Sequence, residues 1–356
     1  MAKPVRLAIN GFGRIGRLLF RQLFALPSEA LAKEGIAFEI VAVNDLGDLE
    51  NLAYLLKYDT VYGRYNREIR NKKSEIGGKL IVDGKEIAVL QEKDPAKLPW
   101  KDLDIDIAVE ATGFFESYDK AKAHLVAGAK RVVITAPAKD AEGTDGGRTV
   151  LVGINEKDLG KAIITSNGSC TTNAVAPVIQ IMSENPGIQK AILNTVHAYT
   201  ATQNIVDGPV KGGKDFRRGR SAAQNIVPST TGAAIAVTRV VPDLEGKFDG
   251  IAIRVPVACG SIADITFLAK RKVTIEEIND IFRKAAAEPR WQGILKVSED
   301  QLVSSDIIGE PYGAVADLSF TKVIDGDLVK VFAWYDNEAG YVSTLIKHLQ
   351  RVAQFI

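Results

Sequence analysis

A glycine-rich turn near the start of the chain constrains the fold more than any other feature. An apolar run at residues 5–9 leads into the sequence GFGRIG at residues 11–16. Apolar side chains then recur three and four residues apart, which predicts a helix that stops at Pro27. A second apolar run occupies residues 38–43. Strand, glycine turn, helix and strand in this order predict a βαβ unit within a parallel sheet.

The same alternation of strands and helices continues beyond this unit. Helical stretches such as residues 118–127 separate the apolar runs, and an Asp-Gly pair at residues 83–84 predicts a hairpin over residues 79–89. Repeated alternation predicts an α/β, Rossmann-type doubly wound parallel sheet. Its further strands are expected at residues 105–109, 131–135 and 163–165.

A different pattern begins after Cys170. Long alternating runs follow one another with few helical crossovers, which predicts an α+β domain with a mixed or antiparallel sheet. Helices are expected at residues 276–287 and 341–355, and the second of these is expected to dock back on the first domain. The strands of the second domain are expected at residues 191–198, 248–257, 261–269, 314–320 and 328–335.

The length of the chain and its charge balance limit the number of domains and the partners. A chain of 356 residues suggests about two domains. We predict a first domain at residues 1–169, completed by a C-terminal helix at 337–356, and a second at 170–336. The 45 basic and 44 acidic residues give a net charge of +1, which argues against dedicated nucleic-acid binding.

Cysteine usage and hydropathy indicate the compartment. The chain has two cysteines, too few for a disulfide framework and without the spacing of a metal site, so we expect a reducing compartment and no bound metal. No apolar signal core follows the N-terminal charges, and no apolar run approaches the roughly 20 residues needed to cross a bilayer. We therefore expect a cytoplasmic protein that does not engage membranes.

The glycine turn has the context of a dinucleotide-binding fingerprint. Gly11 permits the tight turn, Gly13 lets the backbone approach a pyrophosphate, and Gly16 lets the helix pack closely on the strand. Asp45 follows Gly16 by 29 residues and is suited to accept hydrogen bonds from the adenosine ribose, and the insertion at residues 27–35 accounts for its late position. The pattern predicts NAD rather than NADP, and the alternative is a purely structural glycine turn.

Cys170 is the candidate nucleophile. It lies between a predicted strand and a predicted helix, where a helix start stabilises the thiolate. A lone cysteine is more often a small buried hydrophobic residue, but the neighbours of Cys170 are polar and rich in hydroxyls. His197 ends a predicted strand 27 residues later and is the candidate base. Pro177 predicts a kink or a delayed start in the helix that follows Cys170.

Three similar side chains elsewhere are interpreted as structural. His124 and His348 lie in helical patterns and are expected on helix surfaces. Cys259 lies in a strand-like segment, where a small buried hydrophobic role is favoured.

Residues 200–226 form a long polar stretch rich in glycine and arginine, and a loop of this length is uncommon unless it is functional.

Four separated segments of the chain resemble the phosphorylating glyceraldehyde-3-phosphate dehydrogenase family. They are INGFGRIG, SNGSCTTN, HAYTATQ and WYDNEAGY, in that order along the sequence, and the likeness extends from Val5 to about Leu349. The resemblance implies that Cys170 adds to an aldehyde to form a hemithioacetal and that His197 acts as the base. Hydride transfer to NAD then gives a thioester, which inorganic phosphate converts to an acyl phosphate.

The resemblance also implies a set of binding residues and an oligomeric state. We expect a homotetramer, with the loop at residues 200–226 near subunit contacts, that acts on small-molecule substrates. The NAD site is expected to include Asn10, Gly11, Gly13, Arg14, Ile15, Gly16, Asp45, Lys93, Thr135 and Asn337. The attacking phosphate is expected at Ser169, Thr171, Thr231 and Gly232, and the substrate phosphate at Thr200, Arg217 and Arg254.

The chain departs from the family pattern at several positions near the substrate. Gly168 stands where the family usually has alanine, Ile235 replaces a frequent lysine, and Arg218 replaces an acidic or neutral residue. Arginine suits phosphate because its guanidinium forms a bidentate fork. Taken alone, however, the arginines at residues 217–220 are better interpreted as a solvated basic loop.

Three alternative functions are open at this point. Erythrose-4-phosphate dehydrogenase uses the same thiol chemistry, although the segment TTGAA at residues 230–234 resembles the glyceraldehyde enzyme more closely. A thiol hydrolase or acyltransferase could use Cys170 and His197 without a hydride step, but it would have no need of the glycine fingerprint. A non-catalytic NAD-binding protein would keep its binding role without Cys170.

Overall fold

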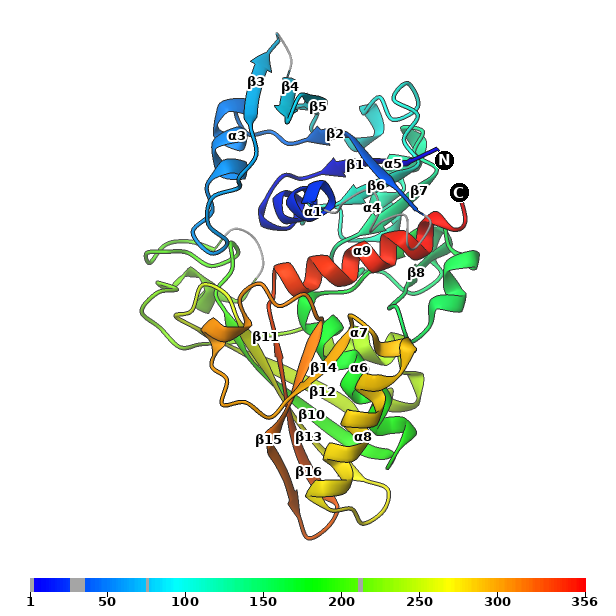
Figure 1. The fold of residues 1–356 in the computed structure, drawn as a ribbon, viewed down its shortest axis with the longest axis vertical. Coiled ribbons are helices and arrows are strands. Elements are labelled where there is room, and N and C mark those ends of the chain that lie inside the picture. Colours follow the sequence, from blue (N-terminus) through cyan, green and yellow to red (C-terminus); the bar gives the residue numbers. More distant parts are fainter. Residues whose placement is uncertain (1–2, 26–35, 75–76, 211–213) are drawn as a thin grey trace. The chain divides into compact units, whose positions relative to one another are not determined.

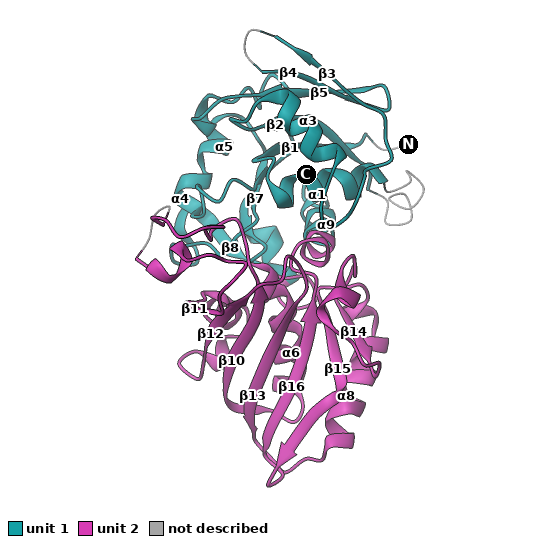
Figure 2. Cartoon of the chain, turned by 90° about the vertical axis from the view of Figure 1, so that its left-hand side faces the viewer, with its two compact units in different colours: residues 1–150, 156–168, 345–356 teal, residues 151–155, 169–344 magenta. Residues whose placement is uncertain are grey.

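The chain forms two compact units (Figure 2). The computed structural model describes residues 3–25, 36–74, 77–210 and 214–356. Unit 1 comprises residues 1–150, 156–168 and 345–356, and unit 2 comprises residues 151–155 and 169–344. The division between the units falls inside the last helix, α9 (Ala339–Ala353). The domain boundaries at 169 and 337 stay a prediction about which parts fold independently.

Unit 1 is built on a nine-stranded sheet with the order β3-β4-β5-β2-β1-β6-β7-β9-β8. The strands from β5 through β2, β1, β6, β7 and β9 to β8 pair in parallel, while β3, β4 and β5 pair antiparallel at one edge. The predicted doubly wound sheet is confirmed. Its strands are β1 (Val5–Asn10), β2 (Phe38–Asn44), β3 (Ile69–Lys73), β4 (Gly78–Val82), β5 (Lys85–Leu90), β6 (Ile107–Glu110), β7 (Arg131–Ile134), β8 (Gly147–Thr149) and β9 (Ile164–Ser166).

The hairpin predicted from the Asp-Gly pair is also present. It joins β4 to β5 through Asp83 and Gly84, which both adopt positive φ angles, of 48° and 80°. A two-residue turn of this kind matches the twist of the flanking strands.

Helices connect and cover the strands of unit 1 (Figure 1). Helix α1 (Arg14–Ala25) buries Leu18, Leu19 and Leu23, which lie on one face because of their spacing. The predicted stop at Pro27 and the insertion at residues 27–35 lie outside the described residues. The other helices in the described part of unit 1 are α3 (Leu49–Lys57), α4 (Tyr118–Ala121), α5 (Ala123–Val126) and the part of α9 from Leu345 onward.

Close packing of α1 on the sheet depends on the glycine turn. Gly11 adopts a φ of +98°, which side chains of L residues rarely allow. A Cβ atom on Gly16 would lie 2.1 Å from the carbonyl oxygen of Gly11, so only glycine permits this approach. No atom lies within 4 Å of a Cβ built on Gly13, which leaves the backbone there open to a ligand.

Unit 2 is built on a seven-stranded mixed sheet with the order β11-β12-β10-β13-β16-β15-β14. The pairs β10–β12 and β14–β15 are parallel and the other neighbours are antiparallel. The predicted mixed sheet is therefore confirmed. Its strands are β10 (Ile188–Ala198), β11 (Val227–Thr230), β12 (Phe248–Val255), β13 (Ser261–Ala269), β14 (Leu295–Ser298), β15 (Ala314–Ile324) and β16 (Leu328–Tyr335).

Three helices pack on one face of this sheet: α6 (Cys170–Glu184), α7 (Ala233–Val240) and α8 (Ile275–Ala287) (Figures 1 and 2). Side chains alternate between the faces of a strand, so Leu193 and His197 of β10 are buried while Ile192 is 59% exposed. This alternation directs His197 to the face that α6 covers.

Two local features of unit 2 differ from the expectations. Helix α6 begins at Cys170 and runs through Pro177, so the delayed start is excluded, while a kink at Pro177 stays a prediction. The reason is the cap at Ser169, which initiates the helix two turns before the proline. Strand β12 ends at Val255, so Cys259 lies in the connection to β13 rather than in a strand, although it is buried as expected. Among the described residues, no helix is both long enough and apolar enough to span a membrane.

Candidate active site

Cys170 is the first residue of α6 and is half-buried. Ser169 caps the helix: its hydroxyl accepts a hydrogen bond from the Thr172 amide at 3.1 Å, and the Thr172 hydroxyl accepts one from the Ser169 amide at 3.2 Å. Gly168 precedes the cap with a φ of +63°, a conformation that favours glycine and accounts for glycine at this position. The cap therefore fixes the thiol at the N-terminus of the helix.

His197 lies beside the thiol, as the sequence predicts. Its Nε2 atom is 3.4 Å from Cys170 Sγ, and the imidazole is 3% exposed. The ring contacts Tyr335 edge-on, with 5.8 Å between ring centroids. The two residues come together because β10 delivers His197 at its C-terminal end, next to the start of α6.

Tyr335 ties these two elements together, and sequence reasoning did not single it out. Its hydroxyl lies 2.9 Å from the hydroxyl of Thr171 on α6 and 2.7 Å from that of Thr195 on β10. Burial raises the pKa of Tyr335, so the phenol keeps its proton and remains a donor. The WYDNEAGY segment carries this tyrosine, but nothing in its spacing reveals the two hydroxyl partners.

Arg254 contacts the far side of the imidazole. It is the register partner of His197 on the parallel strand β12, and its Nη1 lies 2.7 Å from His197 Nδ1 and 3.0 Å from the carbonyl oxygen of Ala198. His197 Nδ1 is itself 2.7 Å from that carbonyl oxygen. Arginine can only donate, so Nδ1 accepts from Arg254 or donates to Ala198, but cannot do both.

These two arrangements give the imidazole opposite roles toward the thiol. When Nδ1 accepts from Arg254, a neutral ring carries its proton on Nε2 and donates toward Cys170 Sγ. When Nδ1 donates to the Ala198 carbonyl, Nε2 has a free lone pair and accepts the thiol proton. The position of the Arg254 side chain therefore determines whether His197 can act as a base.

Burial controls the charge of both reacting groups. It lowers the pKa of His197 to about 3, with the positive charge of Arg254 as the second cause. Burial also raises the pKa of the Cys170 thiol, and Arg254 only partly opposes this effect. The backbone N–H groups of Cys170 and Thr171 at the helix start lower the thiol pKa, but burial outweighs them in the resting site. A neutral thiol faces a neutral imidazole, so attack by sulfur needs a base.

The hydroxyl residues predicted to bind the attacking phosphate lie on two helix starts. Ser169 and Thr171 flank the thiol, and Thr171 Oγ1 is 4.0 Å from Cys170 Sγ. Gly232 is the N-cap of α7, and Thr231 Oγ1 accepts a hydrogen bond from the Ala233 amide at 3.2 Å. A Cβ on Gly232 would meet no atom within 4 Å, which leaves its backbone open.

Arg217, predicted to bind the substrate phosphate, and its neighbour Arg218 differ in their exposure. Arg217 has a side chain that is 57% exposed and forms an ion pair with Asp215 at 2.8 Å. The side chain of Arg218 is 28% exposed, donates from Nε to the Ser229 hydroxyl at 3.0 Å and lies 3.6 Å from the same Asp215. Burial lowers the pKa of Arg254, and the charge of Arg218 adds to this effect. The solvated-loop interpretation fits Arg217 better than Arg218.

Thr200 lies just beyond β10, where its hydroxyl is 2.9 Å from that of Thr202. Asn337 lies beyond β16 and is buried. Its Oδ1 accepts hydrogen bonds from the Gly260 amide at 3.1 Å and the Ser261 hydroxyl at 2.9 Å. Because Oδ1 accepts from these two donors, the orientation of the Asn337 amide is fixed. Its NH2 group is then the side that can donate to a ligand.

A pocket with a volume of about 400 Å³ opens at the carboxyl edge of the sheet in unit 1. Asp45 lines it, held by the Phe12 amide on Oδ2 at 2.7 Å and the Gly47 amide on Oδ1 at 2.8 Å. Ligands of such sheets bind at this edge. The lining residues are Asn10, Gly11, Gly13, Asn44, Asp45, Leu46, Glu92, Lys93, Ala111, Thr112, Phe114 and Phe115.

This pocket suits the adenosine half of a dinucleotide. The open backbone at Gly13 provides an N–H donor for phosphate. The carboxylate of Asp45 provides an acceptor for ribose hydroxyls. Four other residues of unit 1 predicted for the NAD site do not line it. Arg14 directs its guanidinium to Asp59 in an ion pair, and the Thr135 hydroxyl donates to the Glu110 carbonyl at 3.0 Å. Ile15 and Gly16 lie in α1 and are also absent from the lining.

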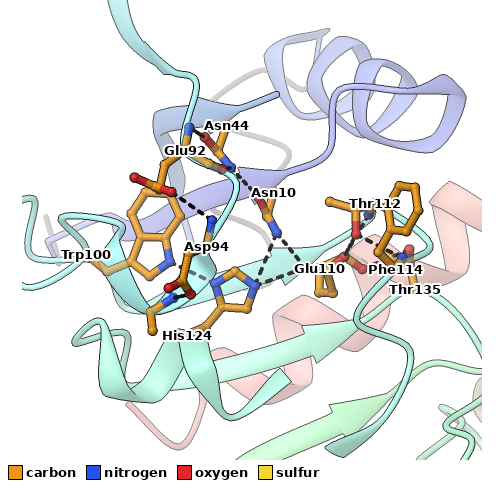
Figure 3. Close-up of polar contacts among 11 residues, drawn as sticks. Asn10, Asn44, Glu92, Asp94, Trp100, Glu110, Thr112, Phe114, His124 and Thr135 are labelled. Atoms are coloured by element: carbon orange, nitrogen blue, oxygen red, sulfur yellow. Dashed lines mark hydrogen bonds and ion pairs between the residues drawn. The ribbon is translucent and has the colours of Figure 1, made fainter. Parts of the chain in front are cut away.

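The predictions for the other two histidines are wrong. His124 and His348 are both fully buried, with 0% exposure, rather than on helix surfaces. His348 Nε2 lies 2.7 Å from the hydroxyl of Thr165, and burial lowers the pKa of His348 to about 4. His124 contacts Glu110 and Trp100 behind the unit 1 pocket (Figure 3).

Comparison with known proteins covers nearly the whole chain. The family model described as glyceraldehyde 3-phosphate dehydrogenase, NAD binding domain, matches residues 5–118, and the C-terminal domain model matches residues 169–337. Glyceraldehyde-3-phosphate dehydrogenase from Streptomyces coelicolor is 48% identical over 96% of both chains. The enzyme of that name from Clostridium pasteurianum is 45% identical over 98% of both. The chain belongs to the glyceraldehyde-3-phosphate dehydrogenase family.

Family membership confirms several predictions made from the sequence. The chain is an oxidoreductase that acts on an aldehyde group with NAD as its cofactor. A hydrolase or a protein that only binds NAD is disfavoured. The relatives described above carry the glyceraldehyde-3-phosphate name, which also disfavours the erythrose-4-phosphate alternative.

The charge of Arg254 gives a prediction for the reactivity of the thiol. In Arg254→Gln, the cation that lowers the pKa of Cys170 is absent, so less thiolate forms at a given pH. Loss of Arg254 also lets His197 Nδ1 donate to the Ala198 carbonyl, which turns Nε2 into an acceptor, but burial is the larger cause of the low pKa of His197 and keeps it a weak base. The lost charge therefore dominates, and alkylation of Cys170 by iodoacetamide should slow about threefold or more below the thiol pKa.

The measurement is the alkylation rate as a function of pH. Arg220→Gln is the control, because Arg220 is exposed and paired with Asp207. Alkylation at the unaltered rate in Arg254→Gln would contradict this electrostatic role.

Proposed function

We propose that the chain is a phosphorylating glyceraldehyde-3-phosphate dehydrogenase. It oxidises D-glyceraldehyde 3-phosphate with NAD and inorganic phosphate to 1,3-bisphosphoglycerate through a thioester on Cys170. The observation that carries this proposal is the 3.4 Å contact between Cys170 Sγ and His197 Nε2 in a member of this family. A thiol next to a neutral imidazole at a helix start is suited to covalent catalysis on a carbonyl.

His197 moves the protons of this reaction. Its Nε2 accepts the thiol proton as sulfur attacks the aldehyde carbon, and returns a proton to the oxygen of the hemithioacetal. It then accepts that hydroxyl proton when the hydride leaves the same carbon, so that a C=O bond re-forms and Cys170 carries a thioester. Bound NAD supplies the hydride acceptor. Phosphate oxygen attacks the thioester carbon, the C–S bond breaks, and the thiol is regenerated.

Substrate binding prepares His197 for this role through Arg254. A phosphate group on the substrate engages the guanidinium and draws it away from Nδ1. The Nδ1–H then donates to the Ala198 carbonyl, 2.7 Å away, and Nε2 becomes an acceptor that faces Cys170. The base is thus available when a phosphorylated substrate is bound.

Two anion sites flank Cys170 in this proposal. Arg254 and Thr200 hold the substrate phosphate, and Arg218 joins them in place of Arg217 because its side chain is less exposed, at 28% against 57%. Two cations that approach each other are stabilised by a shared anion. The hydroxyls and amides at the starts of α6 and α7 bind the attacking phosphate through Ser169, Thr171, Thr231 and Gly232.

The cofactor contacts follow from the unit 1 pocket and from Asn337. Asp45 accepts from the adenosine ribose and repels a 2′-phosphate, which favours NAD over NADP. Gly13 presents its backbone N–H group to the pyrophosphate, whereas the Gly11 N–H donates to the Asn44 carbonyl at 2.8 Å, and Lys93 lines the same pocket. Asn337 donates from its oriented amide to the nicotinamide carboxamide.

We place this enzyme in the cytoplasm as a homotetramer. Both cysteines are free, which suits a reducing compartment. The sheet face of unit 2 opposite the helices exposes Ile192, Ile251 and Phe320, with exposed fractions of 59%, 52% and 50%. Exposed apolar side chains on one sheet face favour burial between subunits. Sedimentation equilibrium tests this proposal, and a monomer at micromolar concentration would exclude the tetramer.

A steady-state assay tests the proposed reaction. With glyceraldehyde 3-phosphate, NAD and phosphate, NADH absorbance should rise, and turnover should fall sharply without phosphate because the thioester accumulates. Cys170→Ser should lose activity by a factor of about 1000 or more and still bind NAD. Cys259→Ser is the control, because Cys259 is buried against Asp336. Faster turnover with erythrose 4-phosphate would favour the alternative enzyme.

The assignment of Arg218 to the substrate phosphate gives a paired prediction. Arg218→Gln should raise KM for glyceraldehyde 3-phosphate about tenfold or more, because a charge-assisted contact to phosphate is lost. Arg217→Gln should change KM by less than about twofold, because Arg217 faces solvent. Initial rates at varied substrate concentration measure both values. The reverse order of effects would restore Arg217 as the phosphate ligand.

A further inference from the structure

Four buried polar side chains form a cluster behind the unit 1 pocket (Figure 3). Glu110 ends β6, His124 lies on α5, Asn10 ends β1, and Trp100 lies in the loop that follows Pro95–Lys97. His124 and Trp100 are 0% exposed, and Glu110 and Asn10 are 2% exposed. None of the proposed catalytic steps uses His124, Trp100 or Glu110, so the cluster calls for a separate explanation.

The hydrogen bonds of His124 determine its protonation. Trp100 Nε1 lies 2.9 Å from His124 Nδ1, and an indole N–H can only donate. His124 Nδ1 must therefore be an acceptor, which places the imidazole proton on Nε2. That proton points to Glu110 Oε2, 3.0 Å away. His124 is thus a neutral donor to a carboxylate, and a doubly protonated ring would set two N–H groups against each other at Trp100.

Glu110 collects four donors on its two oxygens. Oε2 accepts from His124 Nε2 and from Asn10 Nδ2 at 2.6 Å. Oε1 accepts from the Thr112 amide at 2.8 Å and from the Thr112 hydroxyl. A buried carboxylate needs such a set of donors, because each missing hydrogen bond leaves a charged oxygen unsatisfied. Glu110 therefore fixes the orientations of Asn10 and Thr112, and His124 supplies the remaining donor of the set.

These two residues lead directly to the pocket lining. Asn10 Oδ1 accepts from Asn44 Nδ2 at 2.7 Å, and Asn44 accepts in turn from the Glu92 amide at 2.9 Å. The Thr112 hydroxyl accepts from the Phe114 amide at 3.1 Å. All five of these residues line the pocket. The chain of hydrogen bonds from Trp100 therefore reaches both sides of the pocket, across β1, β2 and β6 (Figure 3).

From this arrangement we propose that His124 is a positioning residue for NAD, acting through Glu110 on the walls of the adenosine pocket. It touches neither the substrate nor the cofactor. Its Nε2–H, fixed by Trp100, completes the donor set of Glu110, and Glu110 orients Asn10 and Thr112 at the pocket surface. The proposal takes from the proposed function only that this pocket binds the adenosine half of NAD.

His124→Leu tests the proposal, because it fills the same space without a donor. The dissociation constants of NAD and of ADP-ribose, measured by isothermal titration calorimetry, should both rise about tenfold. ADP-ribose lacks the nicotinamide ring, so it reports on the adenosine, the pyrophosphate and the second ribose without the contacts of that ring. KM for NAD should rise by a similar factor while kcat at saturating NAD stays within about twofold. If NAD weakens but ADP-ribose does not, positioning at the adenosine pocket is excluded.

Two further variants separate positioning from general loss of stability. His348→Leu removes the other buried histidine of unit 1, which hydrogen-bonds Thr165 and, among the described residues, forms no hydrogen bond with the pocket lining. The His348→Leu variant should have a lower melting temperature and an unchanged affinity for ADP-ribose. His124→Gln keeps an N–H donor for Glu110 and should recover most of the ADP-ribose affinity that His124→Leu loses. Equal weakening in His348→Leu, or no recovery in His124→Gln, would overturn the proposal.

The outcome remains decisive if His124→Leu does not fold. In that case His124→Gln and Trp100→Phe are compared instead. Trp100→Phe removes the donor that fixes the imidazole tautomer of His124. Trp100→Phe should weaken ADP-ribose more than His124→Gln does, and the opposite order would contradict the proposal. Failure of the unaltered protein to bind NAD would instead count against the proposed function.

Discussion

The contact between Cys170 and His197 depends on a helix start and a strand end that meet at one point. The Ser169 cap fixes where α6 begins, and side-chain alternation along β10 turns His197 toward that start. The hydroxyl of Tyr335 bonds to Thr171 and Thr195, one from each element, and so holds the two in register. The order of the strands in unit 2 brings these elements together, and every step of the proposed reaction uses the geometry that results.

Two buried histidines in this chain each lie next to a side chain that can only donate hydrogen bonds, and this neighbour influences which ring nitrogen carries the proton. Arg254 competes with the Ala198 carbonyl for His197 Nδ1, so the role of the imidazole depends on where the guanidinium lies. Within the described part of the chain, no second group competes with Trp100 for His124 Nδ1, so that tautomer is fixed. The first arrangement suits a proton carrier that must change state, and the second suits a permanent support for Glu110. The same physical rule thus yields a reactive group in unit 2 and a structural one in unit 1.

The sequence predicted features that depend on local spacing. The glycine turn identified the first βαβ unit, and the alternating runs at residues 261–269 and 328–335 matched β13 and β16 in both position and length. It could not predict features that depend on distant partners. His124 lies on a helix of four residues, too short to show a buried face, and its burial is set by Glu110 and Trp100. Helix α3, begun by the Asp48 cap, was missed as well. The pKa of the Cys170 thiol is raised because the whole fold buries it, an effect that exceeds that of the helix start.

The central claim is that Cys170 carries the acyl group between oxidation and transfer to phosphate. Its most direct test is intact-protein and peptide mass spectrometry after the chain is mixed with glyceraldehyde 3-phosphate and NAD in phosphate-free buffer. The account predicts one added acyl group per chain, located on Cys170 and released when phosphate is supplied. No adduct, or an adduct on Cys259 alone that persists in phosphate, would contradict it.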